Sequence, residues 1–134
     1  MSRDRRPPPP RILRYDLGDG WLLLVGRSDA DNDKLSTRIA RPNDYWFHVR
    51  GMPGSHVVLQ GPSGEEPSRE LLKKAASVAA HHSKARDGGV VAVSYTQAKN
   101  VSKPRGVPLG TVTIRRESVL KVRPTPGEDV GEAC

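Results

Sequence analysis

The sequence contains a single cysteine, Cys134, and has no apolar run long enough to cross a membrane. One cysteine excludes an intrachain disulfide, so a reducing cytoplasm is the expected compartment. A membrane-spanning helix needs about 18 consecutive apolar residues. The N-terminal MSRDRRPPPP is not followed by the apolar stretch of a signal peptide. We therefore expect a cytoplasmic protein with no membrane partner.

Common catalytic patterns are missing as well. No GKS or GKT is present to complete a phosphate-binding loop of nucleotide hydrolases. No GxSxG elbow is present, and Ser55 and His56 are neighbours that fall on opposite faces of a strand, which argues against a Ser-His-Asp hydrolase. The sequence thus predicts no small-molecule substrate and no cofactor.

Four histidines raise the question of a metal site. His81 and His82 are adjacent, so on a helix they point about 100° apart and cannot chelate one ion together. His48 and His56 lack a cysteine or a clear carboxylate partner beyond Asp44. We expect no metal.

What the sequence has in excess is positive charge. Lys and Arg number 22 against 15 acidic residues, a formal net charge of +7. Residues 1–10 contribute +2 and residues 124–134 contribute −3, so the body between them carries +8. A compact body of this charge attracts polyanions such as RNA, DNA or acidic lipid, although charge also keeps a protein in solution.

The length of 134 residues is typical of one domain. Residues 1–10 end in four prolines and are expected to form a disordered arm. Residues 124–134 are Pro/Gly-rich and acidic and are expected to be a disordered tail. The folded domain should therefore span 11–123.

Hydrophobic periodicity and turn residues predict the secondary structure. The expected strands are 11–17, 20–26, 44–50, 55–60, 89–95, 111–116 and 118–124, the last two as a hairpin. The expected helices are 28–40, which Ser28 begins and Pro42 stops, and 68–86, which Gly88 and Gly89 end. The order ββαββαβββ with short links predicts an α+β fold, a mostly antiparallel sheet with two helices packed on it.

The segment 44–50 is the most informative for function. With period two, one face carries the apolar Tyr45, Phe47 and Val49, and the other carries Asp44, Trp46, His48 and Arg50. Exposed, the second row could stack bases and hold phosphate. Covered by a helix, the same row would bury Trp46 and hydrogen-bond His48 inside. The alternation alone leaves both arrangements open.

Pairing with the next strand would extend this row. If Val49 lies opposite Ser55, then His48 lies opposite His56 and Trp46 lies opposite Val58. A one-residue bulge would undo this register. The connecting turn 51–55 could also present backbone N–H groups to an anion.

The segment 96–110 is expected to be a flexible basic loop. Lys99, Lys103 and Arg105 stand in it without a nearby acid in the sequence. Such cations commonly contact phosphate oxygens, which supply affinity but little sequence information.

Four motifs in fixed order carry a family resemblance. They are D-x-W-x-H in DYWFHVR, PGSHV, the SKAR of AASVAAHHSKAR, and K-x-x-x-K-P-x-G in the basic loop. From about residue 20 to 123 the sequence resembles the NFACT-R domain, the RNA-binding domain of NFACT proteins of ribosome-associated quality control. The resemblance implies binding of RNA, with transfer RNA on a stalled large ribosomal subunit as the ligand of full-length members.

The resemblance and the residue patterns together define the predicted RNA-binding positions. They are Arg27, Asn32, Asp33, Asp44, Trp46, His48, Arg50, Gly54, Ser55, His56, Ser83, Lys84, Lys99, Lys103 and Arg105, with Pro104 and Gly106 beside them. Full-length members carry an N-terminal domain, a helix-hairpin-helix region and a coiled coil, which this sequence lacks. A stand-alone protein that binds tRNA or rRNA in translation, quality control or RNA processing is expected.

Two other functions stay open. His48 and His56 with Asp44 could share general acid and base roles in an RNA-modifying or RNA-cleaving enzyme. The domain could instead be a protein-interaction module that docks on a ribosomal partner. We expect RNA binding without catalysis.

Overall fold

An antiparallel sheet that is buried on both faces organises the fold. The computed structural model describes residues 12–126 and 129–133, so the arm expected at 1–10 lies outside the described residues. Within them, the sheet has the strand order β8-β5-β3-β4-β2-β1-β9, and neighbouring strands are antiparallel. The strands are β1 (Ile12–Gly18), β2 (Trp21–Gly26), β3 (Tyr45–Val49), β4 (Val57–Gln60), β5 (Val91–Gln97), β8 (Ser118–Val122) and β9 (Asp129–Ala133). The α+β fold with two helices is confirmed.

The register between β3 and β4 is the one the sequence suggested. Trp46 pairs with Val58, and Phe47 pairs with Val57. The same register brings the rings of His48 and His56 to a centroid distance of 5.4 Å. No bulge shifts this pairing, so Trp46 and His48 lie on one face of β3 as the alternation predicted.

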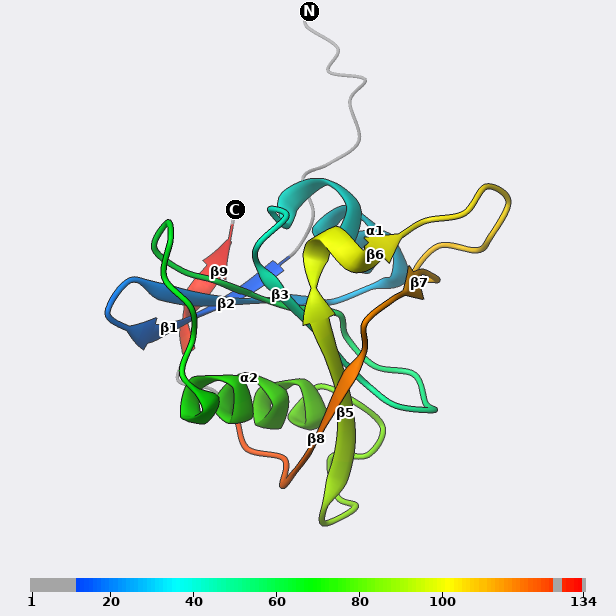
Figure 1. Cartoon of the computed structure of the whole chain (residues 1–134). Helices are drawn as coiled ribbons and strands as arrows, with labels where there is room; N and C mark the ends of the chain where they lie inside the picture. Colours follow the sequence, from blue (N-terminus) through cyan, green and yellow to red (C-terminus); the bar gives the residue numbers. More distant parts are fainter. Residues whose placement is uncertain (1–11, 127–128, 134) are drawn as a thin grey trace, which may run out of the picture.

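Helix α2 (Arg69–His81) covers one face of the sheet. Ser68 begins it by accepting a hydrogen bond from the backbone N–H of Leu71 at 3.1 Å. Its alanines allow close approach to the sheet, where Phe47 and Val49 are almost completely buried. The expected apolar face of β3 is thus confirmed, and Figure 1 shows α2 (green) below the strands.

The other face is covered by α1 (Asp29–Lys34) and the π-helical turn η1 (Leu35–Ile39). Ser28 caps α1 as expected, accepting from the backbone N–H of Asp31 at 3.0 Å. Leu35 is fully buried and packs with Trp46 and Val58 in a second core cluster. Figure 1 shows α1 (cyan) on the opposite side of the sheet from α2.

A small hairpin completes this second cover. The 3-10 turn η2 (Ala98–Asn100) leads from β5 into β6 (Val101–Ser102), which pairs with β7 (Thr113–Ile114). We call residues 101–114 the flap. Val101, Val112 and Ile114 pack against the cluster that contains Trp46. The loop expected at 96–110 is therefore partly structured.

Three expectations differ from the structure. The helix expected at 68–86 ends at His81, because the residues that follow leave the helix and Ser83 forms a β-bridge with Gly54. The hairpin of 111–116 with 118–124 is wrong, since one intervening residue is too short for a tight turn and β8 pairs with β5 instead. Residues 129–133, expected to be loose, form β9 against β1.

Gly26 offers a test of how closely α1 approaches the sheet. A Cβ atom at Gly26 would lie 2.1 Å from Oδ1 of Asn32, which accepts the backbone N–H of His56 at 3.0 Å. We predict that Gly26→Ala lowers the free energy of unfolding by about 2–4 kcal/mol in urea titrations, because it displaces a buried hydrogen-bonded side chain.

A double-mutant cycle isolates this cause. In an Asn32→Ala background the 2.1 Å clash with Oδ1 is gone and only the 3.2 Å contact with Cα of residue 32 remains, so Gly26→Ala should cost clearly less further stability. An equal cost in both backgrounds would show that Asn32 is not what excludes a side chain at Gly26.

Candidate functional site

Trp46 lies in the interior rather than on an exposed row. Its side chain is 3% exposed, and its indole Nε1 donates to Oγ of Ser36 at 2.9 Å. The same hydroxyl lies 2.7 Å from Nδ1 of His56. Of the two arrangements that the alternation left open, Trp46 takes the covered one, because α1, η1 and the flap pack on this face of the sheet. The prediction that its ring stacks on bases is therefore wrong.

His56 is a buried, neutral member of this network. Since Ser36 accepts from Trp46, its hydroxyl proton is available to Nδ1, which places the ring proton on Nε2. Burial, and then the neighbouring His48, lowers the pKa of His56 to about 4. His56 therefore supports the fold, and at 3% exposure its ring does not reach a ligand.

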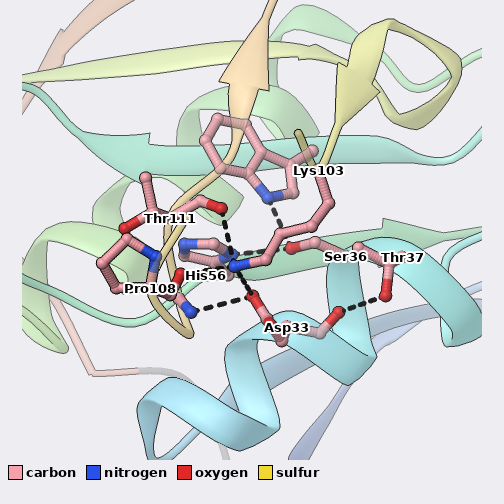
Figure 2. A network of polar contacts seen from close by, with 9 residues as sticks. Asp33, Ser36, Thr37, His56, Lys103, Pro108 and Thr111 are labelled. Atoms are coloured by element: carbon pink, nitrogen blue, oxygen red, sulfur yellow. Dashed lines mark hydrogen bonds and ion pairs between the residues drawn. The ribbon is translucent and has the colours of Figure 1, made fainter. Parts of the chain in front are cut away.

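Lys103 is also structural. Its Nζ forms a 3.0 Å ion pair with Oδ1 of Asp33 and donates to the carbonyls of Pro108 and Thr111. The same carboxylate oxygen accepts the backbone N–H of Gly110 at 2.8 Å. Figure 2 shows Lys103 reaching from the flap to Asp33 on α1. The expectation that Lys103 has no acidic neighbour is therefore wrong.

Asp44 is held away from the strand histidines. Its side chain is buried, and Oδ2 accepts from the backbone N–H of Arg41 and from Nε2 of Gln60, both at 2.8 Å. Nε of Arg41 lies 3.5 Å from Oδ1. The acid that influences His56 is Asp33 instead. Asp44 therefore bonds to Arg41 in its own loop and to Gln60 at the end of β4. It does not bond to either strand histidine.

His48 and Arg50 line an open cavity of about 230 Å³ beside the flap, which we call the His48 cavity. The ring of His48 stacks on Trp46 at a centroid distance of 6.0 Å. Burial lowers the pKa of His48, so it is neutral at pH 7. Arg50 is exposed, and its Nε lies 3.6 Å from Oε2 of Glu117. Val112 and Ile114 also line the cavity, so it offers both polar and apolar side chains.

Six of the predicted positions meet at a larger surface cavity of about 420 Å³. We call it the Arg27–Lys84 cavity. Three segments that are distant in sequence form it: the start of α1, the turn between β3 and β4, and the residues after α2. The lining residues are Arg27, Ser28, Asp29, Asn32, Pro53, Gly54, Ser55, His81, His82, Ser83, Lys84 and Arg86.

Close backbone contacts hold this cavity together. A Cβ atom at Gly54 would lie 2.9 Å from Cβ of Ser83, so only glycine permits the approach. The N–H of Ser55 donates to the carbonyl of His82 at 3.0 Å. The hydroxyl of Ser83 donates to the carbonyl of Ala80 at 2.7 Å and accepts from the N–H of Ala85. Gly54 and Ser83 therefore position the backbone that carries Lys84 and Arg86.

The charged side chains that line the cavity are mostly cations. Arg27, Lys84 and Arg86 are exposed, and Asp29 is the one acid among its lining residues. Burial, followed by His81, Arg86 and Arg27, lowers the pKa of His82 to about 4. An anion of phosphate chemistry fits such surroundings.

The remaining predicted cations do not join this cavity. Lys99 is exposed and lines a separate hollow with Arg115 and Arg116, and Arg105 is exposed on the flap. Sequence reasoning missed Arg86, although it closes the SKAR motif, and it assigned Arg115 and Arg116 to a strand. The surface therefore presents cations in several places.

Neither a metal centre nor a membrane helix is found in the part of the chain that the structure describes. No three side chains of His, Cys, Asp or Glu come together there in a group that could hold an ion. No helix among the same residues is long and apolar enough to cross a bilayer.

The low pKa of His56 predicts a pH-dependent stability. The unfolded chain binds a proton below about pH 6.5 and the folded chain only below about pH 4, so this contribution to stability is present above pH 6.5 and is lost as the pH falls. We expect His56 to account for a loss of roughly 2 kcal/mol between pH 7 and pH 5 in urea unfolding.

His56→Gln should flatten this dependence, and the surface variant His81→Gln should keep most of it. Equal slopes for His56→Gln and the unsubstituted chain would contradict the buried neutral state.

Comparison with known proteins agrees with these motifs. A family model described as "NFACT protein RNA binding domain" matches residues 12–116. The "Rqc2 homolog RqcH" of Bacillus subtilis (strain 168) is 36% identical over 123 residues, and that of Streptococcus suis is 39% identical over 121. These matches cover 92% and 90% of this chain but only 21% of each relative.

Two further matches are informative. The "Ribosome quality control complex subunit NEMF homolog" of Drosophila melanogaster is 35% identical over 69% of this chain and 10% of its own length. A solved structure of the C-terminal part of the fibronectin/fibrinogen-binding protein from Streptococcus suis matches with a TM-score of 0.80 and 38% identity, over 92% of this chain and 49% of the other. The chain spans about a fifth of the bacterial relatives' length, and it belongs to the family of NFACT protein RNA-binding domains.

Proposed function

We propose that this chain binds structured RNA through the Arg27–Lys84 cavity. The observation that carries the proposal is the meeting of three motif segments around exposed Arg27, Lys84 and Arg86. The family description names RNA binding. The net charge of +7 supplies the long-range attraction that brings a polyanion to the surface.

We propose tRNA or ribosomal RNA as the ligand, and ribosome quality control in the cytoplasm as the setting. Support comes from relatives whose names refer to the ribosome quality control complex or to Rqc2. The large ribosomal subunit is then the proposed place of binding. These relatives are several times longer than this chain, so their whole activity is not carried over to it.

Base or ribose contact is assigned to the His48 cavity. Trp46 is only 3% exposed and stacks on His48, and the two residues line the open cavity together with Arg50. A flat ring entering there would meet the imidazole of His48 and the apolar side chains of Val112 and Ile114. Aromatic and guanidinium groups commonly stack unpaired bases in RNA-binding proteins.

We further propose that the chain binds RNA without turning it over. A pair of His48 and His56 would need one protonated imidazole, but burial lowers the pKa of both rings. Asp44 is bonded to Arg41 and Gln60 and assists neither ring. His56 is sealed beneath the flap, with Nδ1 occupied by Ser36. A cleaved or mass-shifted tRNA after incubation with the protein, lost in His48→Ala, would contradict this proposal.

Neutralising the cavity should change the salt dependence of binding. We predict that Lys84→Gln/Arg86→Gln flattens the slope of log affinity for a tRNA transcript against log salt concentration by roughly 1.4–1.8 units, because each lost phosphate contact removes about 0.7–0.9. Fluorescence anisotropy across salt concentrations measures this slope.

Lys73→Gln/Lys74→Gln removes the same charge from exposed positions of α2 that do not line the cavity, and serves as the matched control. An unchanged slope in Lys84→Gln/Arg86→Gln, or an equal loss in the control, would remove the cavity from the interface. Crosslinking in cells followed by sequencing of the attached RNA then distinguishes tRNA from ribosomal RNA.

A further inference from the structure

A second cationic hollow lies at the end of β5, outside the Arg27–Lys84 cavity. It has a volume of about 590 Å³ and is lined by Gln97, Lys99, Asn100, Arg115 and Arg116. We propose that this hollow is a second binding site for the phosphate backbone of the same RNA. The inference deepens the proposed function and rests on it.

The hollow is preorganised by hydrogen bonds between its two segments. The backbone N–H of Arg115 donates to the carbonyl of Asn100 at 3.0 Å. The hydroxyl of Thr96 donates to the carbonyl of Arg115 at 2.8 Å and accepts from Nδ2 of Asn100 at 3.1 Å. The cations therefore project from a fixed frame, which lowers the entropic cost of binding an anion.

The charge of the hollow is not balanced by acids. Lys99, Arg115 and Arg116 are exposed, and none has an acidic partner among the described residues. The neighbouring Glu117 is bonded elsewhere, to Arg50 at 3.6 Å and to the hydroxyl of Ser94. Three like charges that share one hollow favour an anion, and guanidinium groups pair with phosphate through two hydrogen bonds.

The backbone at Arg116 adds a second observation. Its φ of +55° is in the left-handed region, which glycine or asparagine adopts more readily than arginine. A glycine would therefore make this turn at lower cost. The turn itself therefore does not account for an arginine at this position.

The position of the hollow indicates a polynucleotide. Gln97 pairs with Tyr45 at the start of β3, whereas the turn that follows β3 lines the Arg27–Lys84 cavity. The five residues of β3 alone span roughly 17 Å. A mononucleotide is too short to contact both sites, but a folded RNA can do so.

The test uses the full chain and a tRNA transcript. We expect Lys99→Gln/Arg115→Gln/Arg116→Asn to flatten the log–log salt slope by about 2–3 units and to weaken binding at low salt at least tenfold. Asparagine tolerates the left-handed backbone at position 116, so the turn is kept. The control Arg69→Gln/Lys73→Gln/Lys74→Gln on exposed α2 positions removes equal charge and should change the slope little.

The outcomes separate this inference from the function on which it rests. A wild-type slope in the triple variant, with tight RNA binding by the unsubstituted chain, overturns the second site and leaves the proposed function standing. An equal flattening of the slope in the control also overturns the second site, because it would show that only the total charge of the protein matters. Failure of the unsubstituted chain to bind the transcript overturns both. If the triple variant does not fold, Arg116→Asn alone should still flatten the slope by about one unit, and an unchanged slope would overturn the site.

Discussion

The ion pair between Lys103 and Asp33 is the contact on which the arrangement of this domain depends. It joins the flap to α1 across the second face of the sheet, and the same carboxylate fixes the backbone of Gly110. With the flap in place, Trp46 is covered and its indole N–H is satisfied by Ser36. Without the flap, the apolar cluster around Trp46 would be open to water. A domain of this size tolerates such exposure poorly.

This constraint separates two kinds of residue within the family motifs. Asn32, Asp44, Trp46 and His56 are buried and hydrogen-bonded, so they build the support of the site. Lys84 and Arg27 stand outside, on a frame that Gly54 and Ser83 bring together. A motif that looks like one binding surface in sequence is thus a scaffold with a few exposed cations attached.

The electrostatics of the exposed part follow from the same arrangement. The histidines near the sheet lose their charge through burial, so the positive potential comes from Arg and Lys and does not depend on protonation near pH 7. Two cationic sites at different ends of β3 face solvent, while Glu117 and Asp33 are paired with Arg50 and Lys103. Such a pattern suits a long anion better than a small one.

The sequence by itself determined the local structure. Period-two alternation fixed which face of β3 carries Phe47, and a serine began each helix at Ser28 and Ser68. The pairing of Trp46 with Val58 was a register that the sequence suggested but that a bulge could have undone, and the structure confirmed it. The four motifs identified the family. Tertiary structure alone decided that both faces are buried, that α2 ends at His81, that β7 pairs with β6, and that Lys103 contacts Asp33. The physical reason is that these outcomes depend on contacts between residues as distant as 33 and 103, whose free energy no local pattern contains.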